Sequence, residues 1–396
     1  MSRRLAILGG GPVGLECLLR AVADGWDARL YERERVGAHV RAWGHVRMFS
    51  PWSMNLSSLG RAAVGDALPP GDALPTGEEY AAAYLDRLAA LPALAGRIAL
   101  GTEVLAVARD DLGKDEAIGA PERTRRPFRL LLRDDSGERE VTTDIVVDAT
   151  GVFGAHNWLG AGGAPAVGET AAGARIEYRL PDLEGRDRAR FAGRRVVVVG
   201  AGHSAATAVG ALADVAAAAP GTRVAWVTRA DRERPVVEVS GDPLTERARV
   251  TGRANAIAAA AAPWLEQVPG ARVRALVPDG AGVRVEVENG GPVALEADIV
   301  LALVGYRPDP GLARELQVQI CWATEGTYPL AAALLAREGG AADCLAAGGL
   351  GPDTLVHPEP GYFAIGAKSY GRNPDFLIRA GIEQVDQLFG ILGGEA

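Results

Sequence analysis

Cysteine is scarce in this chain of 396 residues, which holds three of them, Cys17, Cys321 and Cys344. Three scattered cysteines cannot build a disulfide framework or a four-thiolate metal site, and such sparse use fits a reducing cytoplasm. Histidine is also rare, and the five histidines show no metal-ligand spacing and no H-E-x-x-H pattern. The sequence therefore predicts no metal site. The Gly-x-Ser-x-Gly elbow of serine hydrolases is absent as well.

Long hydrophobic runs and an excess of positive charge are both missing. No apolar run reaches the roughly 18 residues that a membrane span needs. The run Leu5–Leu8 near the start is short and leads straight into glycines, which is typical of a strand rather than an export signal. The formal net charge of −8 argues against generic binding to nucleic acid or to an anionic membrane. Any phosphate site must therefore be local.

Glycine, by contrast, is abundant at 51 residues, nearly twice the usual share of about 7%. Two similar stretches of the chain each contain a glycine-rich turn. The first has a strand pattern at Leu5–Leu8, a helical pattern at Leu15–Ala23 and a second strand at Ala28–Tyr31. The second stretch repeats this order, with Arg195–Val199, Ala206–Ala217 and Val224–Thr228. Two β-α-β units predict an α/β protein with two Rossmann-like dinucleotide-binding domains.

The first glycine turn reads Gly9-x-Gly11-x-x-Gly14. Its first glycine lets the chain turn sharply, the second lets the backbone approach a pyrophosphate, and the third lets helix pack close on strand. Phosphates would meet unpaired N–H groups and the positive end of the helix dipole. Glu32 lies 18 residues after Gly14, where a carboxylate accepts ribose hydroxyls. With the adjacent Arg33, these residues predict a dinucleotide site; the alternative is an ordinary glycine-rich turn.

The second turn reads Gly200-x-Gly202-x-x-Ala205, in which alanine is still small enough for close packing. Thr228 and Arg229 end its second strand, without an acid there. An arginine at this point pairs with a 2′-phosphate, which a carboxylate would repel. NADPH is therefore favoured over NADH. The alternative is that Arg229 and the arginines nearby form a solvated basic loop.

Two dinucleotide folds in one chain, with an acid after the first and an arginine after the second, resemble the two-dinucleotide-binding-domain flavoproteins. Further stretches carry the same resemblance in the right order: Thr102-Glu103-Val104, Asp148-Ala149-Thr150-Gly151, Gly305-Tyr306 and Gly361–Gly366. The resemblance implies a discontinuous FAD domain at 1–164 and 311–396, with an NADPH domain inserted at 165–310. It places Val104, Thr150, Gly151 and Gly366 at the flavin nucleotide. It also implies that the chain could form homodimers.

Within that class, the chain most resembles the class B flavin monooxygenases. The glutathione- and thioredoxin-reductase branch needs two nearby cysteines to relay electrons, and no C-x-x-C or C-x-x-x-x-C pair exists here. Trp43 and the stretch His45–Asn55 are similar to the segment with which class B enzymes line flavin and substrate. The resemblance implies that Asn55 hydrogen-bonds a flavin hydroperoxide or the nicotinamide. The alternative is that Asn55 caps a surface loop.

Two features depart from the monooxygenase pattern. The F-x-G-x-x-x-H-x-x-x-[WY] fingerprint is absent before the second glycine turn, and only a compressed cluster at Phe153–Trp158 resembles it. In the tail, Ala367 and Lys368 replace the acid that many reductases place after Ala-Ile-Gly. Lys368 could then meet flavin phosphate, flavin carbonyl oxygens or an acidic substrate. The alternative is that Lys368 is a solvated surface lysine.

These observations predict an FAD- and NADPH-dependent monooxygenase that uses molecular oxygen. Its substrate would be a nitrogen, sulfur or carbonyl centre of a small molecule. One alternative is an NAD(P)H-dependent flavoprotein reductase or dehydrogenase that passes electrons to a small acceptor or carrier. The other alternative is a flavin-binding redox sensor with little turnover.

Overall fold

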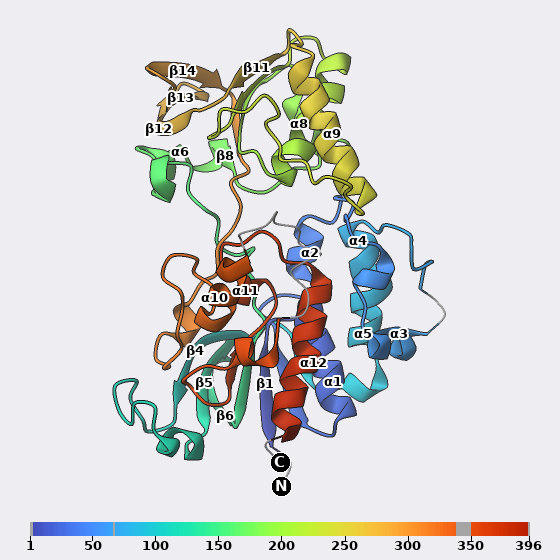
Figure 1. Cartoon of the computed structure of the whole chain (residues 1–396), viewed down its shortest axis with the longest axis vertical. Coiled ribbons are helices and arrows are strands. Elements are labelled where there is room, and N and C mark those ends of the chain that lie inside the picture. Colours follow the sequence, from blue (N-terminus) through green and yellow to red (C-terminus); the bar gives the residue numbers. More distant parts are fainter. Residues whose placement is uncertain (1–2, 66–67, 338–349, 395–396) are drawn as a thin grey trace. The chain divides into compact units, whose positions relative to one another are not determined.

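The computed structural model describes residues 3–65, 68–337 and 350–394, so Cys344 lies outside the described residues. The chain forms two compact units (Figure 1). Unit 1 comprises Met1–Ala155 with Tyr306–Ala396, and unit 2 comprises His156–Gly305. Unit 1 is thus discontinuous in sequence.

Unit 1 is built on a five-stranded sheet in the order β16-β7-β1-β2-β3. Every neighbouring pair in it is parallel, and its central strands β1 and β7 are buried along nearly their whole length, as expected where both faces are covered. Its strands are β1 (Arg4–Leu8), β2 (Asp27–Tyr31), β3 (Ile98–Ala99), β7 (Ile145–Asp148) and β16 (Tyr362–Ala364). The chain leaves β1 toward β2 and later returns to β7 on the other side of β1. The carboxyl ends of β1 and β7 therefore mark the point at which such sheets bind ligands.

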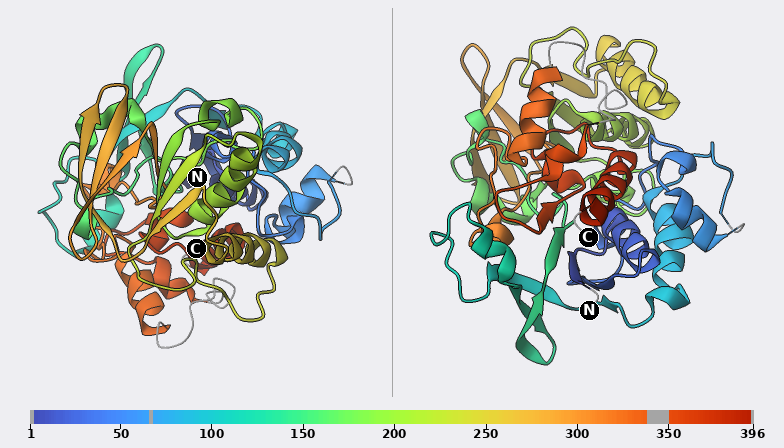
Figure 2. Two further views of the ribbon diagram at one scale, coloured as in Figure 1. Left: turned by 90° about the horizontal axis from the view of Figure 1, so that it is seen from above. Right: turned by 60° about the horizontal axis from the view of Figure 1, so that its bottom comes forward.

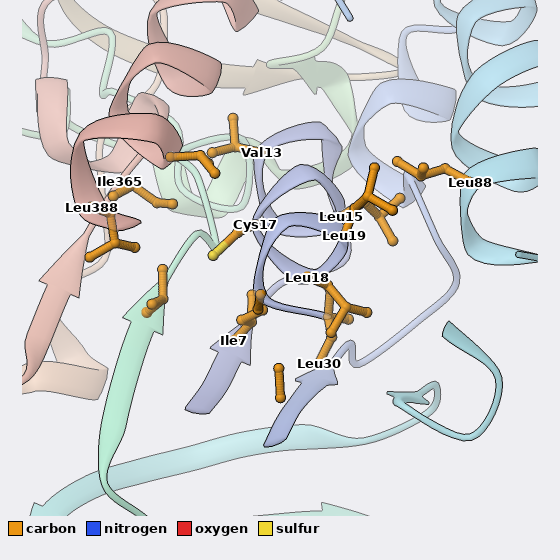
Figure 3. Packing of buried hydrophobic residues seen from close by; sticks show 14 of the residues in the cluster. Ile7, Val13, Leu15, Cys17, Leu18, Leu19, Leu30, Leu88, Ile365 and Leu388 are labelled. Carbon is orange, nitrogen blue, oxygen red and sulfur yellow. The ribbon is translucent and has the colours of Figure 1, made fainter. Parts of the chain in front are cut away.

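Two helices of unit 1, α1 (Pro12–Ala23) and α12 (Ile378–Gly394), pack against each other although they come from opposite ends of the chain (Figure 1). Helix α1 begins three residues before the predicted Leu15, because the fixed φ of Pro12 suits the first helical position. Figure 3 shows apolar side chains of α1 and α12 meeting those of β1 and β2, with Cys17 among them. Cys17 is therefore a core residue.

The remaining helices of unit 1 surround this core. Thr76 and Glu79 form a capping box at the start of one of them, and both bonds of the box are present. A π-helical turn at Ala81–Leu85 lies between α4 and α5. The helices around the core of unit 1 are α2 (Ala38–Ala42), α3 (Ser58–Val64), α4 (Gly77–Tyr80), α5 (Asp86–Ala89), α10 (Tyr328–Arg337) and α11 (Ala367–Tyr370).

An antiparallel sheet completes unit 1, formed by β4 (Glu103–Arg109), β5 (Phe128–Asp134) and β6 (Gly137–Thr143). The charged insertion between β4 and β5 carries a short 3₁₀ turn at Pro121–Arg125. Arg123 from this insertion is fully buried and donates to both carboxylate oxygens of Glu359. Arg109 donates to the same carboxylate at 2.7 Å. A buried two-to-one ion cluster thus anchors the insertion to the tail of the chain.

Unit 2 repeats the plan of unit 1. Its parallel sheet runs β11-β10-β9-β15-β8, again with a central strand that precedes a glycine turn. Helices α8 (His203–Ala218) and α9 (Thr245–Ala259) pack side by side (Figure 2). Its strands are β8 (Ile176–Glu177), β9 (Arg195–Val199), β10 (Arg223–Val227), β11 (Leu265–Val268), β12 (Arg272–Asp279), β13 (Gly282–Glu288), β14 (Pro292–Ala297) and β15 (Ile299–Ala302). Two further short helices are α6 (Glu169–Ala172) and α7 (Arg188–Phe191).

The antiparallel sheet β12-β13-β14 of unit 2 matches β4-β5-β6 of unit 1 in its place along the chain. The first strand of each three-stranded sheet also has a register irregularity near its start, between Val273 and Ala275 and between Val104 and Ala106. The predicted fold class, two Rossmann-like domains with one inserted in the other, is confirmed.

Candidate functional site

The first glycine turn connects β1 to α1 in the conformation that its sequence predicts. Gly9 has a φ of +102°, and a Cβ there would lie 2.8 Å from the backbone oxygen of Ala149. A Cβ on Gly14 would lie 2.0 Å from the oxygen of Gly9, so only glycine lets the helix pack this close. A Cβ on Gly11, however, would meet no described atom within 4 Å. The space beside Gly11 and the first N–H groups of α1 fit a phosphate.

Glu32 lies just beyond the end of β2, beside this turn. Its two carboxylate oxygens accept from the backbone N–H groups of Gly10, at 2.6 Å, and Glu34, at 2.9 Å. These bonds fix the carboxylate while leaving lone pairs on both oxygens for ribose hydroxyls. The backbone N–H of Thr102 donates to the backbone oxygen of Glu32. This bond brings the start of β4, with Val104, close to Glu32. Arg33 is exposed, and its guanidinium lies 3.3 Å from the ring of His39.

Lys368 is buried rather than solvated, and its predicted role toward a ligand stays a prediction. It is 7% exposed, and its Nζ lies 2.6 Å from Asp148 and donates to the hydroxyl of Thr150 at 2.9 Å. Asp148 also accepts from the hydroxyls of Thr150 and Tyr362. Burial alone would raise the pKa of Asp148, but Lys368 and the hydrogen bonds hold it below its ordinary value. The lysine therefore fixes the Thr150–Gly151 turn at the end of β7.

The turn at Gly366 is held by α12. Gly366 has a φ of +70°, and its N–H donates to the side-chain oxygen of Gln384 at 2.7 Å. Val13 of the first glycine turn packs against Gly366. A Cβ on Gly381 would lie 2.4 Å from the side chain of Val13. Gln384 and Gly381 thus join the tail to the first glycine turn. Sequence reasoning missed both residues, because nothing local in the sequence marks a contact over this distance along the chain.

Asn55 is fully buried, and its side-chain amide is engaged within its own loop. Its Nδ2 donates to the backbone oxygens of Ser50 and Pro51, at 3.0 and 2.8 Å, while its Oδ1 accepts from the Ser50 hydroxyl at 2.9 Å. Trp43 packs against Gly77, where a Cβ would lie 2.7 Å from the indole ring. The structure thus places Asn55 and Trp43 in the packing of the 43–55 segment. Their predicted roles toward flavin stay predictions.

The second glycine turn, in unit 2, matches the first. Gly200 has a φ of +131°, and a Cβ there would lie 2.3 Å from the oxygen of Leu303. Gly202 resembles Gly11, because a Cβ on it would meet no described atom within 4 Å. Ala205 is fully buried and packs against Gly200, as the small third residue of the motif should. This turn also leaves space for a phosphate at the start of α8.

The end of β10 brings Thr228 and Arg229 beside that turn. Strands β9 and β10 pair in parallel, and the N–H of Gly200 donates to the oxygen of Val227 at 3.0 Å. Thr228 is buried and its hydroxyl donates to the oxygen of Ala230, whereas Arg229 is exposed. An exposed guanidinium next to an open glycine turn suits a 2′-phosphate.

The cysteines that the structure describes do not form a pair. The thiol of Cys17 is buried in the core, and burial raises its pKa. Cys321 is partly exposed, and hydrogen bonds from Thr324 lower the pKa of its thiol. Among the described residues, no cluster of three or more His, Cys, Asp and Glu side chains could hold a metal ion. Within the same residues, no helix combines the length and apolar character that a membrane span requires.

A cavity of about 330 Å³ in unit 1 was not foreseen from the sequence. It lies against the middle of α1 and the first half of α12, and its lining includes Glu16, Arg20, Met54 and Arg379. The carboxylate of Glu16 accepts from the hydroxyls of Ser57 and Tyr84. The glycines of the first turn do not line it.

Residues 3–326 match the pyridine nucleotide-disulphide oxidoreductase family. This confirms the resemblance drawn from the glycine turns. A protein of this family is a flavoprotein oxidoreductase whose cofactors are FAD and a nicotinamide dinucleotide, and the open turns at Gly11 and Gly202 fit one of them each. No curated protein shows significant similarity to the chain.

Solved structures of two kinds of flavoenzyme share the fold. Bacillithiol disulfide reductase from Bacillus cereus is 16% identical over the whole of both chains, with a TM-score of 0.72. The cadaverine monooxygenase of desferrioxamine biosynthesis from Erwinia amylovora, bound to FAD, is 12% identical and has a TM-score of 0.69; the match covers 100% of this chain and 95% of that one. An ornithine N-hydroxylase from a Kutzneria species is 16% identical over both whole chains, with a TM-score of 0.63. At such identities the likeness extends to the fold alone.

Proposed function

Because the chain belongs to the pyridine nucleotide-disulphide oxidoreductase family, we propose that it is an NADPH-dependent flavoprotein reductase of a small two-electron acceptor. When bound, FAD supplies the chemistry that links NADPH oxidation to reduction of the acceptor. Because the sequence has no C-x-x-C or C-x-x-x-x-C pair to relay electrons to a disulfide, the acceptor in this proposal is a quinone, and one NADPH and one proton are consumed for each NADP⁺ formed. For a quinone acceptor the product is the hydroquinone.

Unit 1 holds FAD in this proposal. The N–H groups around Gly11 and the first turn of α1 bind the pyrophosphate, and Glu32 accepts from the ribose hydroxyls. The Thr150–Gly151 turn and Gly366 line the flavin end of the site. Lys368 acts as a positioning residue, because it holds Thr150 through the ion pair with Asp148.

Unit 2 holds NADPH in the same way. The N–H groups that follow Gly202 bind its pyrophosphate, and Arg229 pairs with the 2′-phosphate. An acid occupies the corresponding place in unit 1, beyond β2, so the two sites differ at the residue that reads the ribose. We expect Arg229→Ala to weaken NADPH binding about tenfold or more while leaving NADH binding nearly unchanged. Titration of each nucleotide against the FAD-loaded protein measures this difference.

The observation that favours a reductase over a monooxygenase is the engagement of Asn55. An enzyme that stabilises a reactive oxygen adduct needs a fixed polar partner near it. The amide of Asn55, predicted for this role, is instead committed to Ser50 and Pro51. Electron transfer directly to a small acceptor needs no such partner.

A monooxygenase acting on a nitrogen, sulfur or carbonyl centre is the second candidate. The cysteine pair that reduces protein disulfides is missing from the sequence, and this observation favours it. An ornithine N-hydroxylase and a cadaverine monooxygenase share the fold, so the fold is compatible with this chemistry.

Turnover without oxygen separates the two candidates. The FAD-loaded protein is mixed anaerobically with NADPH and menadione, and the nicotinamide absorbance is followed. We expect NADPH oxidation in one-to-one ratio with acceptor reduced. If NADPH is consumed only in air, and labelled oxygen enters an added amine, the monooxygenase is correct. If NADPH leaves the flavin oxidised under all conditions, the chain is a redox sensor and neither enzyme.

A further inference from the structure

The segment that carries Arg229 is tied to helix α9 at two points. It leaves β10 at Thr228. The backbone N–H of Thr228 donates to the backbone oxygen of Val268, and the backbone oxygen of Thr228 accepts from the N–H of Ala271. From there to the start of α9 at Thr245 the described chain has no helix or strand. A segment of this length without regular structure depends on side-chain contacts for its conformation.

The first tie is Asn255 of α9, which is 6% exposed. Its Oδ1 accepts from the backbone N–H of Val236 at 3.0 Å, and its Nδ2 donates to the backbone oxygen of the same residue at 3.0 Å. The Nδ2 also donates to the carboxylate of Glu238 at 2.8 Å. One amide thus satisfies both backbone groups of Val236, as a neighbouring strand would.

The second tie is the ion pair between Arg247 of α9 and Asp242. Its two parallel hydrogen bonds measure 2.6 and 2.7 Å, and both side chains are nearly fully buried. Asp242 also accepts from the N–H of Leu244 at 2.9 Å. Helix α9 packs against α8, whose first residue, His203, directly follows Gly202 of the second glycine turn.

We propose that Asn255 and the Arg247–Asp242 pair are positioning residues for NADPH. They hold the 229–242 segment so that Arg229 stays at the 2′-phosphate, without touching the nucleotide themselves. This inference rests on the proposed function. It predicts that removing the Asn255 hydrogen bonds or the Arg247–Asp242 pair weakens NADPH binding. NADH binding should stay unchanged, because NADH lacks the 2′-phosphate that Arg229 would bind.

The test is Asn255→Leu, a substitution of similar volume that removes all three hydrogen bonds. Dissociation constants for NADPH and NADH are measured by titration against the FAD-loaded protein. We expect the constant for NADPH to rise about tenfold and that for NADH to change less than twofold. Arg249→Ala is the matched control, since Arg249 lies on the same helix but pairs with Glu246 on the surface. We expect the control to leave both constants unchanged.

Two further variants show whether Asn255 acts through Arg229. In Arg229→Ala, the additional substitution Asn255→Leu should raise the NADPH constant less than twofold, because the contact it supports is already gone. Of the three hydrogen bonds of Asn255, Glu238→Ala removes only the one to the Glu238 carboxylate and should give an intermediate effect. Should Asn255→Leu prove too unstable to purify, Glu238→Ala takes its place in the comparison.

Trypsin supplies a readout that needs no activity. Cleavage after the arginines of the 229–242 segment should be faster in Asn255→Leu than in the control, and NADPH should slow it in the parent protein. Equal weakening of NADPH and NADH, no weakening of either, or independent effects in the double variant would each overturn the inference. Failure of the parent protein to bind NADPH would instead overturn the proposed function, and that titration comes first.

Discussion

The ion pair of Lys368 and Asp148 could not be foreseen from the residues next to either one in sequence. Lysines are usually solvated, and this one was expected either at a ligand or in solvent. It lies at the carboxyl ends of β7 and β16, where the carboxylate of Asp148 has four partners: the lysine, the hydroxyls of Thr150 and Tyr362, and the backbone N–H of Thr150. A buried pair of this kind adds little net stability, but breaking it by removing one partner is costly.

Substitution of Lys368 by methionine should therefore destabilise unit 1 strongly. It leaves the buried carboxylate of Asp148 without its cation, and we expect a loss of about 3–5 kcal/mol in the free energy of unfolding. Urea titration at neutral pH, followed by circular dichroism, measures this loss.

The double variant Lys368→Met with Asp148→Asn is the control for that prediction. It removes both charges and should recover most of the stability, although the protein should bind FAD less tightly because Thr150 loses its anchor. A double variant as unstable as Lys368→Met would show that packing, rather than charge, determines the effect.

At the scale of elements, the first glycine turn separates folding from binding. Gly14→Ala should disrupt the packing of α1 on β1, because the new Cβ would lie 2.0 Å from the oxygen of Gly9. Gly11→Ala should fold normally, since its φ of −79° suits any residue and its Cβ meets no described atom within 4 Å. The methyl group would then occupy the space of the FAD pyrophosphate.

Retained flavin absorbance and the thermal midpoint distinguish the two variants. We expect Gly11→Ala to be purified without bound FAD. Its thermal midpoint should stay within a few degrees of that of the FAD-free parent. We expect Gly14→Ala to lose both FAD and stability. If Gly11→Ala retained its flavin fully, FAD would not bind at this turn, and the prediction would be wrong.

Elements with local signals could be predicted from the sequence. The glycine turns, the strands before them and the capping box at Thr76 each depend on residues close together in the chain. Helix α9 was missed, because its residues show only a weak apolar face and its function is to tie a loop through Asn255 and Arg247. The Gln384 contact and the partner of Lys368 were missed because each joins residues that are distant in sequence.

For the whole molecule, the response to acid should depend in part on His357. This residue is 6% exposed, and neither ring nitrogen has a hydrogen-bond partner among the described residues. Burial lowers its pKa to about 4. Because the unfolded chain binds a proton near pH 6.5, His357 costs no stability above that pH and destabilises the fold increasingly as the pH falls from 6.5 to 4.

Replacing His357 by leucine should remove this pH dependence. We expect similar stabilities for the two proteins at pH 7.5, and a growing advantage for the variant below pH 6, up to about 3 kcal/mol near pH 4. Urea midpoints at several pH values measure it. A parallel decline of both proteins would assign the acid sensitivity to carboxylates such as Asp148.

The buried Arg123 has a consequence for anyone who wishes to shorten the chain. The insertion between β4 and β5 has the composition of a dispensable surface loop, and trimming such loops is a common route to better crystals. Here the trimmed protein would lose one of the two guanidinium groups that neutralise Glu359. The carboxylate would keep the charge of Arg109 but lose the hydrogen bonds from Arg123, and the space of the buried guanidinium would be left empty. A truncated version would therefore have to keep Glu359 as the partner of the buried Arg109 and fill the space that Arg123 leaves.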